Sequence, residues 1–179
     1  MALSKITNDG VATSGLPSGT VLQVKYTQFT STNAVAISSS GNGTALADLT
    51  VNITPTSTSS IIILTAGING EFDSQTTQDV VAFFFRDSTK LAAPAAGNRP
   101  VGIQIGANIS WHLENNASTP EGFHYSYFDT PNTTSQITYK AGLQCTSNRD
   151  YKINGTSLDA DGTSHERGIS FIMAQEIAG

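Results

Sequence analysis

The sequence is poor in the residues that most often build catalytic and nucleic-acid-binding sites. It contains one cysteine, three histidines and nine Lys and Arg residues among 179, and 13% of its residues are charged. The usual charged fraction of a soluble domain is about 25%. The cations are scattered and the net charge is −5, so we expect no nucleic-acid partner. With Cys145 as the single cysteine, no disulfide forms within the chain.

Long apolar runs are also missing. No stretch reaches the roughly 18 apolar residues of a membrane span, and residues 1–19 lack the apolar core of a secretory signal. We therefore expect neither membrane insertion nor secretory export. Six Asn-x-Ser/Thr sequons occur, but 43 Ser and Thr residues produce such triplets by chance, so we do not interpret them as glycosylation sites. They begin at Asn42, Asn52, Asn108, Asn116, Asn132 and Asn154.

The residues that are plentiful favour β-strands. The chain has 15 Ile, eight Phe and five Tyr residues, which are enriched in strands. "ALADLTVNITP" (45–55) alternates apolar and polar residues, and "IIILTAGI" (61–68) is a short β-branched run between turn residues. Similar short runs, separated by Gly, Pro and Asn, recur along the chain. The pattern predicts an all-β fold, an antiparallel, jelly-roll-like β-sandwich of about nine or ten short strands.

A domain boundary is predicted near residue 20. Residues 20–179 are expected to form a single β-sandwich domain, and residues 1–19 an extended N-terminal arm whose polar sequence is interrupted by Gly and Pro. Leu3, Ile6 and Val11 are the apolar residues that would dock this arm on a partner. A mobile chain end is the alternative interpretation.

Two predicted strands raise the question of which side chains are buried. In "TVLQVKYTQFT" (20–30), Leu22, Val24 and Tyr26 alternate with polar residues, which predicts that they form the buried half of the strand. The second strand, "VVAFFFRD", contains three consecutive phenylalanines, and successive side chains point to opposite faces. At least one ring must face outward, so we interpret the run as a candidate subunit interface; a covering loop is the alternative. The run comprises Phe83, Phe84 and Phe85.

No combination of residues predicts an enzyme. The histidines and abundant serines define no triad, and neither G-x-S-x-G nor a cysteine-nucleophile signature occurs. "LDADGTSHE" places Asp159, Asp161 and Glu166 close together, but it lacks the oxygen ligands of an EF-hand loop. We therefore predict no catalytic residue, no cofactor and no metal. A Ca²⁺ ion shared by several surface loops is the alternative.

Three aromatic residues suggest contact with sugars. Tyr125 and Tyr127 share one face of the strand "FHYSYF", and Trp111 lies in a neighbouring segment. Aromatic side chains on a strand face can stack on sugar rings, so these residues are candidates for contacting a host-surface glycan. Packing in the core is the interpretation that we favour over this one for the strand.

Five motifs carry a resemblance to a known family: "SGTVLQV", "ITPTSTSSIIIL", "FRDSTKLA", "FDTPNTTSQITYKAGLQ" and "ERGISFIMAQEIAG". Together they resemble small β-sandwich proteins of tailed bacteriophages, especially those of marine and cyanobacterial hosts, which are described as virion structural or tail-fibre-like proteins. The opening "MALSKI" is also similar to the start of such proteins. The resemblance spans Ser18 to Gly179. The last strand, "ISFIMAQEI", is similar in style to trimeric C1q/TNF-like domains.

The resemblance implies a non-enzymatic homotrimer on the virion surface, synthesised in the host cytoplasm. The arm would attach it to other virion proteins of the capsid or tail. Because only about twenty residues precede the sandwich, we expect a fibre tip or short appendage for host attachment. The alternatives are a capsid decoration (cement) protein that stabilises the head, and a carbohydrate-binding module.

Overall fold

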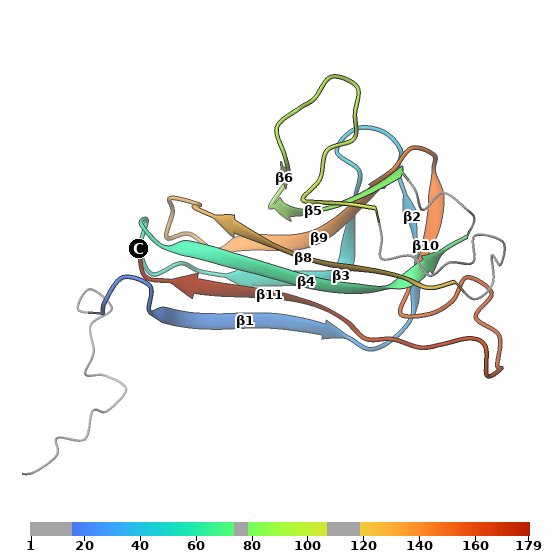
Figure 1. The fold of residues 1–179 in the computed structure, drawn as a ribbon. Helices are drawn as coiled ribbons and strands as arrows, with labels where there is room; N and C mark the ends of the chain where they lie inside the picture. Colours follow the sequence, from blue (N-terminus) through green and yellow to red (C-terminus); the bar gives the residue numbers. More distant parts are fainter. Residues whose placement is uncertain (1–15, 74–78, 107–118) are drawn as a thin grey trace, which may run out of the picture.

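The computed structural model describes residues 16–73, 79–106 and 119–179. These residues form eleven strands in two antiparallel sheets that pack face to face (Figure 1). The all-β sandwich predicted from the sequence is confirmed. Jelly-roll connectivity, and the division into an arm of residues 1–19 and a domain of residues 20–179, stay predictions.

The large sheet contains the two longest pairings of the molecule. Its strands are β1 (Val21–Phe29), β2 (Asn33–Ile37), β4 (Ile61–Phe72), β8 (Glu121–Asp129), β10 (Arg149–Ile153) and β11 (Ser170–Ile177). They follow the order β1-β11-β4-β10-β2, and β8 pairs with the other side of β4. The segment that begins at Ile61 therefore becomes the central strand, paired on both of its edges.

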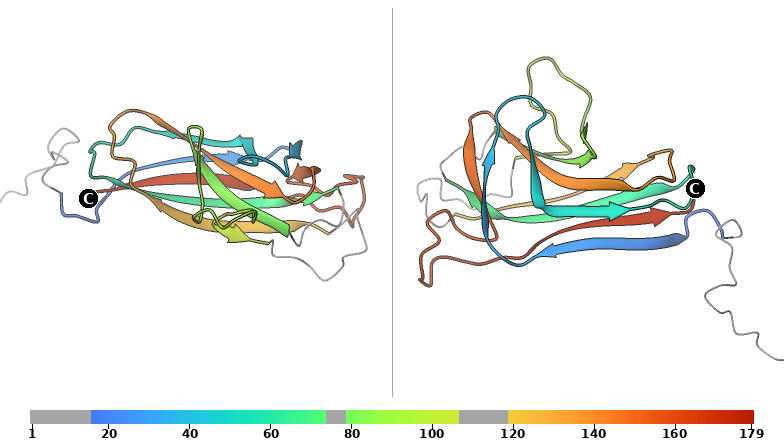
Figure 2. Two further views of the ribbon diagram at one scale, coloured as in Figure 1. Left: turned by 90° about the horizontal axis from the view of Figure 1, so that it is seen from above. Right: turned by 180° about the vertical axis from the view of Figure 1, so that it is seen from behind.

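The small sheet lies on one face of the large one, as the two views of Figure 2 show. Its strands are β3 (Thr44–Ile53), β5 (Val80–Arg86), β6 (Thr89–Leu91), β7 (Gln104–Ile105) and β9 (Ile137–Cys145). The order is β3-β9-β5-β6, and β7 also pairs with β5. The core between the sheets consists of the alternate side chains that both sheets turn inward, such as Leu64 and Ile68 of β4 and Tyr139 and Leu143 of β9.

The burial predicted for the first strand is wrong. Val24 is 45% exposed and Tyr26 is 71% exposed. The register pairs Tyr26 with Met173, and both side chains lie on the side of the sheet away from the core. Gln23 and Thr27 of β1 face inward instead and find hydrogen-bond acceptors there: Gln23 Nε2 donates to the carbonyl of Thr54 and Thr27 Oγ1 to the carbonyl of Thr50.

The interpretation of the three phenylalanines as a subunit interface is also corrected. Phe84 is fully buried in the core between the sheets. Phe83 and Phe85 do face outward from the small sheet, but they are 0% and 7% exposed. They form a second apolar cluster with Val81, covered by Ala45, Ala92 and Ile103. Residues of β3 and of the chain's own β6–β7 connection therefore cover these rings, in line with the alternative interpretation of a covering loop.

A buried carboxylate fixes the polar segment before β4. Glu176 of β11 is fully buried, and its Oε1 accepts hydrogen bonds from Thr56 N (2.6 Å), Thr56 Oγ1 (2.7 Å) and Ser60 Oγ (2.6 Å). Its Oε2 accepts from Gln23 Nε2 at 2.6 Å. Burial alone raises the pKa of Glu176, but these hydrogen bonds outweigh it and the pKa lies below its ordinary value. The hydroxyl-rich turn is therefore held by an ionised acceptor.

Gly142 should be intolerant of a side chain because two rings pack on its backbone. A Cβ at this position would lie 2.7 Å from the Phe83 ring and 2.9 Å from the Phe85 ring. We expect Gly142→Ala to lower the free energy of unfolding by about 1–3 kcal/mol, measured by urea unfolding. At Gly122 a Cβ would meet His124 only at an ordinary 3.6 Å, so Gly122→Ala should change stability by less than about 0.5 kcal/mol. Equal effects at both positions would contradict this account of the cluster.

Candidate functional site

Four of the residues predicted to make contacts lie outside the described part of the chain. Leu3, Ile6 and Val11 of the arm belong to residues 1–15, and Trp111 belongs to residues 107–118. Their roles in docking and glycan contact stay predictions. The described region begins at Leu16, close to the C-terminus. Gly19 N donates to the carbonyl of Ala178 at 2.8 Å and holds the two ends of the described region together.

The tyrosines of β8 do not form an exposed platform for stacking on sugars, because Tyr125 is buried and Tyr127 is half-buried. Tyr125 is 6% exposed, and its hydroxyl donates to the carbonyl of Phe83 at 2.9 Å. Its ring lies 4.7 Å from that of Phe84, between the two sheets. Tyr127 faces the same way and packs against the core. The structure therefore corrects the proposed stacking platform: this face of β8 points into the sandwich.

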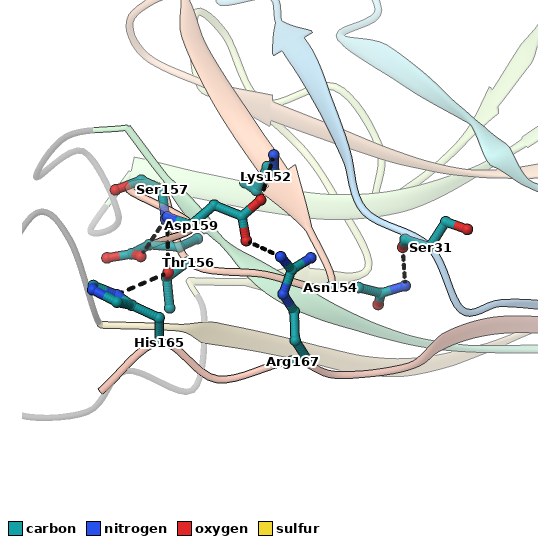
Figure 3. A network of polar contacts seen from close by, with 9 residues as sticks. Ser31, Lys152, Asn154, Thr156, Ser157, Asp159, His165 and Arg167 are labelled. Atoms are coloured by element: carbon teal, nitrogen blue, oxygen red, sulfur yellow. Dashed lines mark hydrogen bonds and ion pairs between the residues drawn. The ribbon is translucent and has the colours of Figure 1, made fainter. Parts of the chain in front are cut away.

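The connection between β10 and β11 forms a polar network at the end of the sandwich opposite the C-terminus (Figures 1 and 3). Asn154, in a left-handed conformation, donates to the carbonyls of Phe29 (2.7 Å) and Ser31 (2.8 Å). Its Oδ1 accepts from Ser170 Oγ at 2.6 Å. One buried amide thus ties together the segment after β1, the end of β10 and the start of β11.

Asp159, the first candidate ligand for Ca²⁺, is occupied by cations of the protein itself. Its Oδ2 lies 3.0 Å from Lys152 Nζ and its Oδ1 lies 2.6 Å from Arg167 Nη2 (Figure 3). Asp161 is exposed nearby. Among the described residues, no group of three or more His, Cys, Asp or Glu side chains is arranged to hold a metal. Asp159 therefore joins the loop to Lys152 of β10 and to Arg167 through ion pairs.

Two buried glutamates lie under this network. Glu71 of β4 accepts hydrogen bonds from Thr119 N and Oγ1, both at 2.8 Å, and from Ser157 N at 2.6 Å. Glu121 of β8 accepts from Phe72 N at 3.0 Å and is 4% exposed. Burial raises the pKa of Glu121 to about 8, partly offset by the Phe72 N–H and reinforced by the nearby Glu71. Protonation of Glu121 is therefore favoured by the fold at this end of the sandwich.

A polar cleft that sequence reasoning missed lies beside the β6–β7 connection. Its volume is about 410 Å³, and its described lining includes Lys90, Arg99, Asn42 and Gln144 but no carboxylate. Lys90 Nζ lies 3.9 Å from the Phe83 ring centroid and donates to Gln144 Oε1 at 2.7 Å. Burial lowers the pKa of Lys90. The signal in the sequence was weak: two scattered cations, nine residues apart, flank an Ala- and Pro-rich loop.

The outward side of the large sheet is the second feature that sequence reasoning missed. Seven large apolar side chains are exposed among the described residues, and Val21, Val24, Tyr26 and Phe128 are four of them. All four lie on the side of β1, β11, β4 and β8 that faces away from the core. The available signal was the apolar pair Phe171 and Met173, which share one face of the last strand.

The chain matches no protein-family model and no curated protein. The resemblance to bacteriophage proteins therefore rests on the five motifs quoted above. Within residues 16–73, 79–106 and 119–179, no helix is long and apolar enough to cross a membrane.

Glu121 should make stability depend on pH. Its folded-state pKa of about 8 lies above the ordinary 4.5, so folding favours the protonated form. The stabilisation is complete below about pH 4.5 and is lost as the pH rises to about 8. We expect the free energy of unfolding to fall by a few kcal/mol across this range, on the order that linkage gives for such a shift. Urea unfolding at several pH values measures it.

Glu121→Gln should remove most of this dependence, because an amide accepts the Phe72 N–H without carrying a charge. The exposed Asp161→Asn serves as the control and should leave the pH profile unchanged. A Gln variant with the same profile as the wild-type protein would assign the dependence to another group.

Proposed function

We propose that this chain is a non-enzymatic structural protein of a bacteriophage particle. It is a homotrimeric fibre tip or short appendage on the virion surface, attached through its N-terminal arm and meeting the host surface with loops at its other end. The proposal combines the motif resemblance with the observation that the two ends of the molecule differ. It assigns attachment and host contact to opposite ends of one rigid sandwich.

One observation carries this assignment. The chain enters the described region beside the C-terminus, where Gly19 and Thr20 form backbone hydrogen bonds with Ala178. The polar loop of residues 154–168 lies at the other end of β11, and Asn154 and Glu71 hold it to the strands beneath (Figure 3). Loops positioned by a rigid scaffold are suited to recognition. In this proposal the arm binds one partner and the opposite end of the sandwich meets another.

A capsid decoration protein would use the same sandwich and arm. The copy number distinguishes the two roles: a tail-associated tip is present in a handful of copies per particle, and a decoration protein in hundreds. Quantitative mass spectrometry of purified particles measures this number. Particles that lack the chain altogether would contradict both virion roles.

Removal of residues 2–15 should separate attachment from folding. The shortened chain keeps residues 16–20, which are hydrogen-bonded to the C-terminal end, so we expect a far-UV circular dichroism spectrum and thermal midpoint close to those of the full chain. It should fail to enter particles when it replaces the full chain during infection. Normal incorporation of the shortened chain would refute attachment through the arm.

The cationic cleft favours a second candidate function, a module that binds acidic saccharides. Lys90 and Arg99 line a hollow of about 410 Å³ together with amide side chains. Lys90 is partly desolvated and has an amide rather than a carboxylate as its hydrogen-bond partner. A carboxylate or sulfate group of a sugar would supply the missing negative charge. This candidate replaces the aromatic platform that Tyr125 and Tyr127 do not form.

Lys90→Met tests this second candidate. The substitution keeps an apolar chain over Phe83 but removes the ammonium group. For an oligogalacturonate probe, we expect the dissociation constant to rise about tenfold or more, as loss of a charge-assisted hydrogen bond predicts. Lys140→Met, a lysine outside the cleft, is the matched control and should bind like the wild-type protein. Isothermal titration calorimetry that detects no binding to the unmodified chain would remove this candidate.

A further inference from the structure

Four strands of the large sheet present an unusually apolar surface to the outside, which we call the outer face. The register aligns its side chains in rows that run across β1, β11, β4 and β8. The outer face comprises Val21, Val24, Tyr26 and Gln28 of β1; Phe171, Met173, Gln175 and Ile177 of β11; Ile61, Ile63, Thr65, Gly67 and Asn69 of β4; and Gly122, His124, Ser126 and Phe128 of β8.

The exposed apolar residues of the described chain concentrate here. Val21, Val24, Tyr26 and Phe128 are 45–71% exposed, and Ile169, directly before β11, adjoins them at 49%. One row runs from Phe128 through Ile63 and Gln175 to Val24, so apolar groups stand at both edges of the face. A contiguous apolar patch of this kind marks an interaction surface rather than ordinary exposure.

The small sheet also has an apolar outward side, and there the chain itself buries it. There Val81, Phe83 and Phe85 also face away from the core, and residues of the β6–β7 connection and of β3 bury them. No described segment covers the outer face of the large sheet in the same way. The apolar outward side of the small sheet is thus buried by the chain itself. The apolar outward side of the large sheet is not buried by any described residues of the same chain.

We propose that the outer face is the contact surface between copies of this chain. The inference deepens the proposed function, because it supplies the surface by which the homotrimer would assemble. It also moves that interface from Phe83, Phe84 and Phe85, which are buried, to the opposite sheet.

The charge of the outer face fits an identical partner. None of its side chains is a Lys, Arg, Asp or Glu, and its titratable side chains are His124 and Tyr26. A face without formal charge can approach a second copy of itself without the repulsion that like charges would cause. The charged groups nearest in sequence, such as Lys25 and Glu176, belong to the other side of their strands. A strongly charged partner would find no complementary group here.

The size of the face fits closure around a threefold axis. Four strands about 4.8 Å apart make it about 19 Å wide. If the outer faces of three chains form the sides of a triangle, each face lies about 5.5 Å from the threefold axis. Two packed sheets are roughly 10 Å apart, so each lies about 5 Å from the plane midway between them, which is a similar distance. Side chains of ordinary size, such as Met173 and Ile63, would therefore fill the centre. The nine residues of β4 from Ile61 to Asn69 make the face about 30 Å long at 3.3 Å per residue.

The experiment introduces charge at both edges of one row. Multi-angle light scattering measures the mass of the purified full chain, and of Val24→Glu and Phe128→Glu singly and together. We expect a trimer of the 18.8 kDa chain for the wild-type protein and the mass of a single chain for the double variant. Far-UV circular dichroism should show an unchanged β spectrum, because both side chains are exposed in the single chain.

Ile105→Glu is the matched control. Ile105 is 82% exposed but belongs to β7 of the small sheet, so this variant should remain a trimer. A wild-type monomer, or a double variant that keeps the wild-type mass, would overturn the inference. A full chain that is monomeric and associates only after removal of residues 2–15 would assign the outer face to the arm and overturn it as well. These measurements need no particles, so their failure is distinguishable from absence of the chain in virions.

Discussion

The alternation of side chains along a pleated strand is the constraint on which this structure depends. Each strand has two faces, and two stacked sheets bury only the faces that they turn toward each other. This chain carries apolar residues on more faces than one core can bury. It therefore has three apolar layers: the core, the cluster of Phe83 and Phe85 beneath the β6–β7 connection, and the outer face of β1, β11, β4 and β8.

Buried polar groups compensate for the scarcity of surface charge and fix the ends of the sandwich. At the end near the termini, Glu176 accepts four hydrogen bonds and holds the turn before β4. Between the sheets, Asp129 accepts from Arg86 and from the hydroxyl of Tyr139. At the other end, Asn154 ties three segments together. Each carboxylate or amide is satisfied within the chain, so these contacts give the loops defined positions.

The proposed role as a virion surface protein joins these features in one molecule. An appendage must bind its particle, associate with its own copies and meet a third surface. The chain offers three separate regions for these contacts: the entry point beside Ala178, the outer face, and the loop of residues 154–168. Because they lie on different sides of one sandwich, binding at one region leaves the others accessible.

Local patterns by themselves determined the fold class and most strand positions, because turn residues and period-two alternation are properties of short segments. The alternating segment 45–55 and the run from Ile61 became parts of β3 and β4 as expected. Only the tertiary structure decided which face of each strand is buried. Val24 and Tyr26 were expected inside and lie outside, whereas Tyr125, a candidate for glycan contact, lies inside. Alternation defines two faces but does not say which one meets the second sheet; register and long-range packing make that choice.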